Sequence, residues 1–226
     1  MGEHDGHRQR LRERFFEFGL DVFQDDQVLE LLLFFAIPRQ DTNAIARKLL
    51  KHFGSLSAVL EADSQELKAA GCVGEQASML LQLIRPLARR YMLSCSEKGQ
   101  LLNSTQACGE YLLPYFFGAT EEQVYLLCLD ARCRVLTCRL LQRGGINNAS
   151  FSLRKVAETA IAAKASSVIL AHNHTSGIAL PSQADYVTTH QVQTTLDALD
   201  IMLADHIIVA GNDFVSMAET GGLNRF

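Results

Sequence analysis

Apolar residues in the first part of the chain, up to about residue 93, recur at the spacing of an α-helix. Leu29, Leu32, Leu33 and Ala36 recur at helical spacing, and Pro38 cannot continue that helix. Further helices are expected from Asp41 or Thr42 to Gly54, after Ser55, from Ser64 to Gly71, and from about Gln76 to Met92. Short helices joined by tight turns predict an all-α domain over residues 1–93.

The pattern changes after a short polar segment, residues 94–103, which we interpret as a linker. Beyond it helices and strands alternate, and the wholly apolar run Val168–Ala171 is typical of a central strand covered on both faces. Helices are expected near 104–117, 153–164 and 183–199, and strands at Gln123–Leu129, Arg134–Leu141, Val168–Ala171, Ile207–Ala210 and near Phe214–Val215, with a loop at 144–148. Residues 104–226 are therefore predicted to form an α/β (α+β) domain, a mixed sheet flanked by helices.

The composition excludes several classes of protein. Hydrophobic residues make up 48% and charged residues 20% of the chain, which is typical of a globular protein rather than a disordered or fibrous one. The apolar run Leu31–Ile37 is far shorter than the roughly 20 residues that span a bilayer, so no membrane association is expected. Six cysteines without a C-x-x-C pair are typical of free thiols in a reducing compartment, which predicts a cytoplasmic protein.

Charge gives no overall attraction for nucleic acid. The formal net charge is −4, and residues 1–100 hold 13 lysines and arginines against 14 acidic residues. The arginines at positions 8, 10, 12 and 14 form either a basic patch or part of a salt-bridged surface helix. Any contact with DNA must therefore come from a local feature.

Two histidines and an aspartate have the spacing of metal ligands. His172 and His174 follow the predicted central strand, and they point to the same side because side chains alternate along an extended chain. Asp185 lies at the start of the next predicted helix. Two imidazoles and one carboxylate suit a zinc ion with an open fourth position, and zinc lowers the pKa of a water in that position from about 15.7 to about 7.

Each of these features also has an ordinary structural explanation. An H-x-H pair can simply be two polar residues at a sheet edge, and Ser182 with Asp185 forms an S-x-x-D capping box. The combination is more specific, because H-x-H, seven residues and S-x-x-D follow one another at a strand end and a helix start.

The pattern His172-Asn173-His174-x7-Ser182-x2-Asp185 resembles the motif of the JAMM (MPN+) metalloproteases. The wider stretch His172–Gly177 with Pro181–Asp185 resembles the RadC-like (UPF0758-type) branch of that superfamily. Further similarities span nearly the whole chain: Gly6-His7-Arg8 with Arg10-Leu11-Arg12, Ile37-Pro38-Arg39 with Asp41-Thr42, Phe53-Gly54-Ser55-Leu56, and Asp205-His206-Ile207-Ile208-Val209. The resemblance implies a JAMM/MPN sheet, similar in topology to that of cytidine deaminases, and zinc-dependent hydrolysis of an amide or isopeptide bond.

The resemblance also implies two catalytic roles. By register with the family's E-x-F-x-V-L-x-L-D pattern, Glu122 would be the general base that takes a proton from the attacking water and passes it to the leaving group. Without the resemblance, Glu121 and Glu122 would be interpreted as a solvated pair in a loop. Ser182 would donate a hydrogen bond to the oxygen that becomes negative in the transition state.

The chain departs from the family pattern at two places. Thr175 stands where the family usually has proline, and Ser152-Leu153-Arg154-Lys155 stands where it has H-P-R-E. The second change removes an expected histidine and an expected acid near the site, which points to different handling of the substrate. His206, which follows Asp205, is interpreted as a structural residue or one that supports a metal ligand.

The segment Leu67–Gly74, followed by Ala77, resembles the helix–hairpin–helix expected in the N-terminal region of this family. The backbone N–H groups of Gly71, Val73 and Gly74 would then bind a DNA phosphate at a helix N-terminus. Cys72, which stands where glycine is usual, and the negative charge of Glu75 both count against this interpretation.

Two classes of function follow. The first is a zinc-dependent hydrolase of the JAMM metallopeptidase type, acting on an unidentified peptide or isopeptide, in a family whose name carries a DNA-repair association. The alternative is a DNA-binding accessory protein in which the metal site is structural or vestigial. Deaminase chemistry lacks support because the H-x-E…P-C-x-x-C signature is missing.

Overall fold

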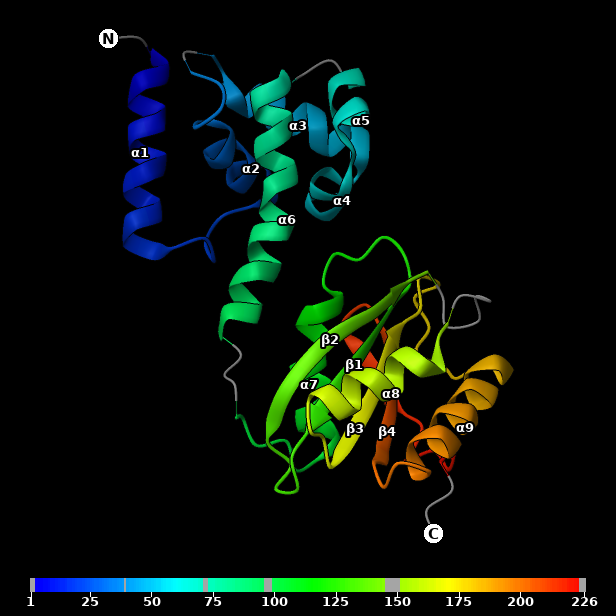
Figure 1. Cartoon of the computed structure of the whole chain (residues 1–226). Helices are drawn as coiled ribbons and strands as arrows, with labels where there is room; N and C mark the ends of the chain where they lie inside the picture. Colours follow the sequence, from blue (N-terminus) through cyan, green and yellow to red (C-terminus); the bar gives the residue numbers. More distant parts are fainter. Residues whose placement is uncertain (1–2, 39, 71–72, 96–98, 145–150, 224–226) are drawn as a thin grey trace. The chain divides into compact units, whose positions relative to one another are not determined.

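The computed structural model describes residues 3–38, 40–70, 73–95, 99–144 and 151–223 of the 226-residue chain (Figure 1). The chain forms two compact units that divide between Ala88 and Arg89. The division falls within a helix rather than at the polar segment 94–103. The guanidinium of Arg89 explains this position, because it donates to the carbonyl of Tyr115 and to the hydroxyl of Tyr125, both in the second unit.

The first unit is built from helices, as the apolar spacing predicts. They are α1 (Glu3–Phe18), α2 (Asp25–Leu33), α3 (Thr42–Phe53), α4 (Leu56–Glu61), α5 (Ser64–Ala69) and the first part of α6 (Glu75–Cys95). The side chain of Asp41 caps α3, which ends at Gly54 in a left-handed conformation with φ of 89°. The core of this unit is made largely of leucines, among them Leu29, Leu33, Leu49, Leu67 and Leu81.

Helix α2 ends at Leu33, several residues before Pro38. The N–H groups of Phe35 and Ala36 bond three residues back, to the carbonyls of Leu32 and Leu33, so the chain tightens into turns there. Ala36 still packs against the core. The helical pattern in the sequence therefore extends beyond the helix itself.

Arginines on α1 are used within the helical unit. Arg8 donates to the carbonyls of Ile37 and Gln40, and its guanidinium lies 4.7 Å from the centre of the Phe34 ring. Arg14 donates to the carbonyl of Val22. These two arginines thus tie α1 to the segments around it.

The second unit contains the predicted mixed sheet with helices on both faces (Figure 1). Its strands, in the order β2-β1-β3-β4-β5, are β1 (Gln123–Leu129), β2 (Val135–Arg143), β3 (Ser167–Asn173), β4 (Met202–Ala210) and β5 (Asp213–Ser216), and its helices are α7 (Thr105–Phe116), α8 (Leu153–Ala162) and α9 (Gln183–Asp197). Strands β3 and β4 are parallel, and the other neighbouring pairs are antiparallel.

The central strands are buried on both faces, and alternate residues enter different cores. Val168 and Leu170 of β3 pack with Val156 of α8 and Val192 of α9. The residues between them, such as Ile169, pack on the other face with α7. This alternation decides which side chains of β3 can meet α9.

Strand β4 begins at Met202, five residues before the predicted strand. Asp205 and His206 interrupt the apolar pattern, but both are buried in the strand. The carboxylate of Asp205 accepts hydrogen bonds from the Ser216 hydroxyl at 2.6 Å and from the Ala218 N–H at 3.0 Å. Satisfied polar groups thus allow a strand where periodicity alone gave no signal.

Residues 145–148 of the predicted loop and 96–98 of the predicted linker lie outside the described residues. Helices α6 and α7 each contain an internal proline. Within the described ranges, no helix combines the length and the apolar character needed to cross a membrane.

Candidate metal centre

His172 and His174 lie at the end of β3, on the sheet face that α8 and α9 cover. His172 follows Val168 and Leu170 in the alternation along the strand and is 1% exposed. His174 donates its backbone N–H to the carbonyl of Val209 at 2.8 Å, so the extended pairing with β4 continues through it. The two rings lie on the same side, as predicted, with their Nε2 atoms 2.9 Å apart.

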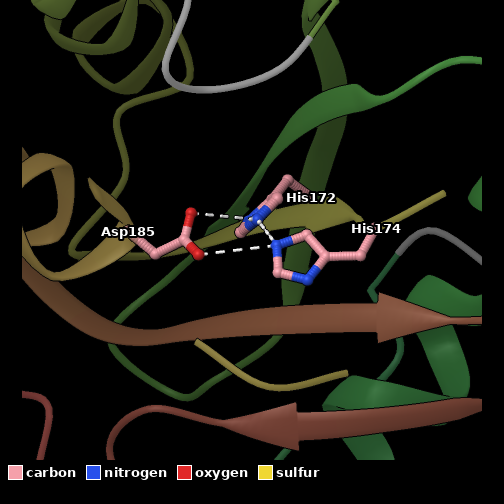
Figure 2. Close-up of side chains that lie close together, drawn as sticks. All are labelled: His172, His174 and Asp185. Carbon is pink, nitrogen blue, oxygen red and sulfur yellow. Dashed lines mark hydrogen bonds and ion pairs between the residues drawn. The ribbon is translucent and has the colours of Figure 1, made fainter. Parts of the chain in front are cut away.

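Asp185 reaches the same point from the first turn of α9 (Figure 2). Its Oδ1 atom lies 3.2 Å from Nε2 of His172, and its Oδ2 atom lies 3.4 Å from Nε2 of His174. One donor atom from each of the three residues lies within 4.8 Å of the others. The three residues therefore form a group that could hold a metal ion.

The helix start that carries Asp185 is fixed by a capping box. The N–H and the hydroxyl of Ser182 both donate to Oδ2 of Asp185 at 2.7 Å, and the N–H of Asp185 donates to the Ser182 hydroxyl at 3.3 Å. The structural explanation of S-x-x-D is therefore correct. It also places the carboxylate, so it does not compete with metal binding.

Asp185 is a carboxylate in this environment. Burial alone would raise the pKa of its carboxyl, but the facing ring of His172 and the hydrogen bonds from Ser182 outweigh burial and hold the pKa well below its usual range. Oδ1 is buried and has no hydrogen-bond partner. A buried negative oxygen without a donor, facing two ring nitrogens, fits a cation, and this donor set is one that zinc takes.

His206 of β4 contacts the ring of His172 at Nδ1, the nitrogen that does not face Asp185. Nε2 of His206 lies 2.9 Å from Nδ1 of His172, and Nδ1 of His206 lies 2.6 Å from the hydroxyl oxygen of Thr189 on α9. His206 is fully buried, and that burial lowers the pKa of the ring well below its ordinary value. His206 is therefore a neutral imidazole with one N–H.

Glu122 directly precedes β1, across the sheet from His174. Val124 pairs with His172 in the antiparallel ladder of β1 and β3, and continuing that register by two residues brings Glu122 opposite His174. Because side chains alternate, Glu122 is on the same face as Val124 and therefore on the face of the metal group. It is half-buried, and its carbonyl accepts from the N–H of Gly144 at 2.7 Å.

Asn173, between the two histidines, holds the backbone on either side of Glu122. Its Oδ1 accepts from the N–H of Gln123 at 2.7 Å, and its Nδ2 donates to the carbonyl of Glu121 at 3.2 Å. Because β3 alternates, the Asn173 side chain lies on the sheet face away from the metal group. The residue thus connects the strand of the ligands to the segment of the predicted base.

Two residues in this surrounding set, Asn173 and Thr189, were not identified from the sequence. Thr189 lies one helical turn after Asp185 on the same face of α9, so the spacing i, i+4 carries a usable signal. Asn173 gives a weaker sequence signal, because a polar residue between two ligands is expected to face solvent until the neighbouring strand is known.

The segment that departs from the family pattern at 152–155 forms the start of α8. Ser152 caps the helix and accepts from the N–H of Lys155. Arg154 pairs with Glu158 on the surface, and the ammonium of Lys155 donates to the carbonyl of Leu141. These four residues thus make local contacts that build the helix start.

The other departure, Thr175, lies in an exposed turn after His174. That turn closes back on the ligand, because Nδ1 of His174 lies 3.1 Å from the carbonyl oxygen of Ile178. A carbonyl can only accept, so Nδ1 of His174 is the donor in this contact, and Nε2 is the ring atom that faces Asp185.

The residues proposed for phosphate binding lie before α6. Gly71 lies outside the described residues. Val73 is 8% exposed and packs in the helical core, and the carbonyl of Gly74 accepts from the N–H of Ser78 in the first turn of α6. DNA binding at this hairpin stays a prediction.

Known proteins match this chain over nearly its full length. The profile of the family described as RadC-like JAB domain matches residues 102–223. The UPF0758 protein of Pseudoalteromonas translucida is 36% identical over 213 residues, 94% of this chain and 95% of the relative. The UPF0758 protein of Azotobacter vinelandii is 35% identical over 215 residues, 95% of this chain and 96% of the relative. The names of these two relatives state no activity.

Proposed function

Because this chain belongs to the RadC-like JAB domain family, we propose that it is a zinc-dependent hydrolase of amide or isopeptide bonds. The observation that carries the proposal is the convergence of two ring nitrogens on a buried carboxylate, one oxygen of which has no hydrogen-bond partner. Two further supports are the contact of Ser182 with that carboxylate and the register of β1 and β3, which sets Glu122 opposite His174. The five described cysteines, all free thiols, support a place in the cytoplasm.

His172, His174 and Asp185 would hold the zinc. Bound there, zinc would supply a Lewis acid that makes water a nucleophile near neutral pH. Three protein ligands would leave such an ion able to bind a water molecule as well. The metal donors and their capping residue come from β3 and the start of α9, both anchored in the core, which keeps the donor atoms in place.

Glu122 is proposed to take the proton from the attacking water and to deliver it to the leaving nitrogen. The register of β1 and β3, which sets Glu122 opposite His174, supports this role, and general acid–base catalysis by a carboxylate contributes about 10²–10⁴ in rate. Ser182 is proposed to donate its hydroxyl hydrogen to the oxygen that gains negative charge in the transition state.

The test combines metal content with hydrolysis. Purified wild-type protein should bind one zinc ion per chain and cleave members of a panel of peptide and isopeptide substrates. The variant His174→Ala should lose both properties. His190→Ala is the matched control, because His190 is exposed on α9 and belongs to no metal group among the described residues. Wild-type protein without stoichiometric zinc, and a His174→Ala variant with unchanged hydrolysis, would overturn the proposal.

A further inference from the structure

We infer that Thr189 and His206 form a hydrogen-bonded relay that fixes the ring of His172 as a metal ligand. The inference rests on the metal site proposed above; it gives Thr189 a role and states how His206 would support a metal ligand. The relay begins at the backbone of one ligand, Asp185, and ends on the ring of another.

The relay consists of three short contacts in a buried chain. The hydroxyl of Thr189 donates to the carbonyl oxygen of Asp185 at 2.6 Å. The hydroxyl oxygen of Thr189 also lies 2.6 Å from Nδ1 of His206. Nε2 of the His206 ring lies 2.9 Å from Nδ1 of His172. The residues Thr189 and His206 are 1% and 0% exposed, so water cannot replace these contacts.

The direction of the relay follows from counting hydrogens. A hydroxyl has one hydrogen, and the Thr189 hydrogen is donated to the Asp185 carbonyl, so Thr189 must accept from Nδ1–H of His206. The other ring nitrogen of His206, Nε2, then accepts from Nδ1–H of His172. This leaves Nε2 of His172, the atom that faces Asp185 and His174, as the ring nitrogen available to a metal ion.

This direction is the one that metal binding requires. A metal ion can bind Nε2 of His172 only when the proton of that ring is on Nδ1, and a reversed relay would place a hydrogen on Nε2 instead. The relay therefore matches the tautomer of His172 that a metal ion requires, and it holds the plane of the ring. Outer contacts of this kind typically contribute about 10–100-fold in metal affinity.

Thr189→Val tests the relay because valine has the shape of threonine without the hydroxyl. We expect Co²⁺ to bind this variant about 10–100-fold more weakly than wild type, measured by competition with a coloured chelator. Thr189→Ser keeps a hydroxyl and should restore Co²⁺ affinity to within about threefold of wild type, because serine can make the same two contacts.

Thr194→Val is the matched control. Thr194 also donates its hydroxyl to a carbonyl four residues back on α9, that of His190, but it is exposed on the surface. The control should bind Co²⁺ like wild type, and thermal unfolding without metal should show that all variants fold. Equal Co²⁺ affinity of Thr189→Val and Thr194→Val would overturn the relay. Failure of wild type and Thr194→Val to bind Co²⁺ would instead overturn the metal site, and the relay with it.

A second readout does not depend on any variant. Nitrogen-15 spectra of the histidine rings in the wild-type protein with Zn²⁺ should show His206 protonated on Nδ1 and unprotonated on Nε2.

Two variants of His206 test the same contact. His206→Gln keeps an acceptor for Nδ1–H of His172 and should retain more Co²⁺ affinity than His206→Leu, which has none. A proton on Nε2 of His206 in wild type, or equal Co²⁺ affinity of the two variants, would overturn the relay.

Discussion

The hydroxyl of Ser182 lies 2.7 Å from Oδ2 of Asp185 and donates its hydrogen to it. Ser182 therefore makes two structural contacts in this structure, because the same hydroxyl oxygen also accepts from the N–H of Asp185. To stabilise an oxyanion, the hydroxyl would rotate its hydrogen away from the carboxylate. Once a metal ion neutralises Asp185, this rotation costs less, because the carboxylate attracts the hydrogen less strongly.

Ser182→Ala separates the catalytic role of the hydroxyl from its capping role. We expect turnover of a cleaved substrate to fall about 10²–10³-fold, the loss typical for one oxyanion donor. Loss of the cap should lower the free energy of unfolding by about 1 kcal/mol. Ser104→Ala is the control, because Ser104 caps α7 in the same way by accepting from the N–H of Ala107. Equal turnover in the two variants would show that Ser182 only caps.

Glu122→Gln should keep the metal and lose turnover. Glutamine preserves the size of the side chain but cannot take a proton, so the rate should fall about 10²–10⁴-fold while the zinc content stays at that of wild type. Glu121→Gln is the matched control, because Glu121 is exposed and pairs with Arg143 on the surface. Loss of zinc from Glu122→Gln would contradict the role of base and make Glu122 a ligand.

Asn173→Ala should lower turnover without removing zinc. The amide of Asn173 bonds the backbone on both sides of Glu122, so its loss leaves the buried N–H of Gln123 without an acceptor and loosens the segment that carries the proposed base. A misplaced catalytic group can cost about 10²-fold in rate. The measurement is kcat beside zinc content. Unchanged kcat in a folded variant would show that the amide does not position Glu122.

The convergence of His172, His174 and Asp185 follows largely from short-range geometry. Alternation along a strand places His172 and His174 on one side, and a capping box fixes Asp185 at a helix start. The carboxylate and the two imidazoles still had to meet in space. Their meeting depends on β3 being followed by a helix on one particular face of the sheet, which the resemblance supplied and the periodicity did not.

The residues around the ligands were harder to predict. His206 comes from β4 and meets His172 because the two strands are parallel neighbours, a pairing that no local pattern encodes. The start of β4 was missed for a related reason, since Asp205 and His206 look polar until their partners are known. Tertiary contacts thus decide the residues that local patterns leave open.

Buried thiols should resist modification while the protein is folded. Burial raises the pKa of Cys108 and of Cys128 to about 11, so at pH 8 only about one thiol in a thousand is the reactive thiolate. Cys95 is exposed. Iodoacetamide at pH 8 should therefore label Cys95 before Cys108 and Cys128, and mass spectrometry should find these two labelled only after unfolding. Labelling of Cys128 as fast as Cys95 would contradict its burial in the sheet.

The same thiols give stability a pH dependence with a defined sign. A folded pKa near 11, above the ordinary value of 9.0, means that the unfolded chain releases the thiol proton first. The thiol therefore favours folding below about pH 9, and this contribution is lost as the pH rises toward 11. The difference in unfolding free energy between wild type and Cys128→Ala should shrink over that range. A difference that stays constant would contradict the raised pKa.

Gly109→Ala should destabilise the second unit, although alanine normally stabilises a helix interior by roughly 0.5–1 kcal/mol relative to glycine. Gly109 lies in α7, and a Cβ atom there would overlap the ring of Phe214 from β5. Overpacking of this kind typically costs about 1–3 kcal/mol, measured as the free energy of unfolding in urea.

Gly6→Ala in α1 is the control for Gly109→Ala, because a Cβ at Gly6 would meet nothing closer than Nη1 of Arg10 at 3.5 Å, so this change should follow the ordinary helix propensity. Phe214→Ala removes the ring that a Cβ atom at position 109 would overlap. In that background Gly109→Ala should therefore no longer destabilise the protein. The double-mutant cycle then gives the coupling between the two positions. Stabilisation by Gly109→Ala in the wild-type background would show that α7 and β5 do not pack as closely as the structure has them.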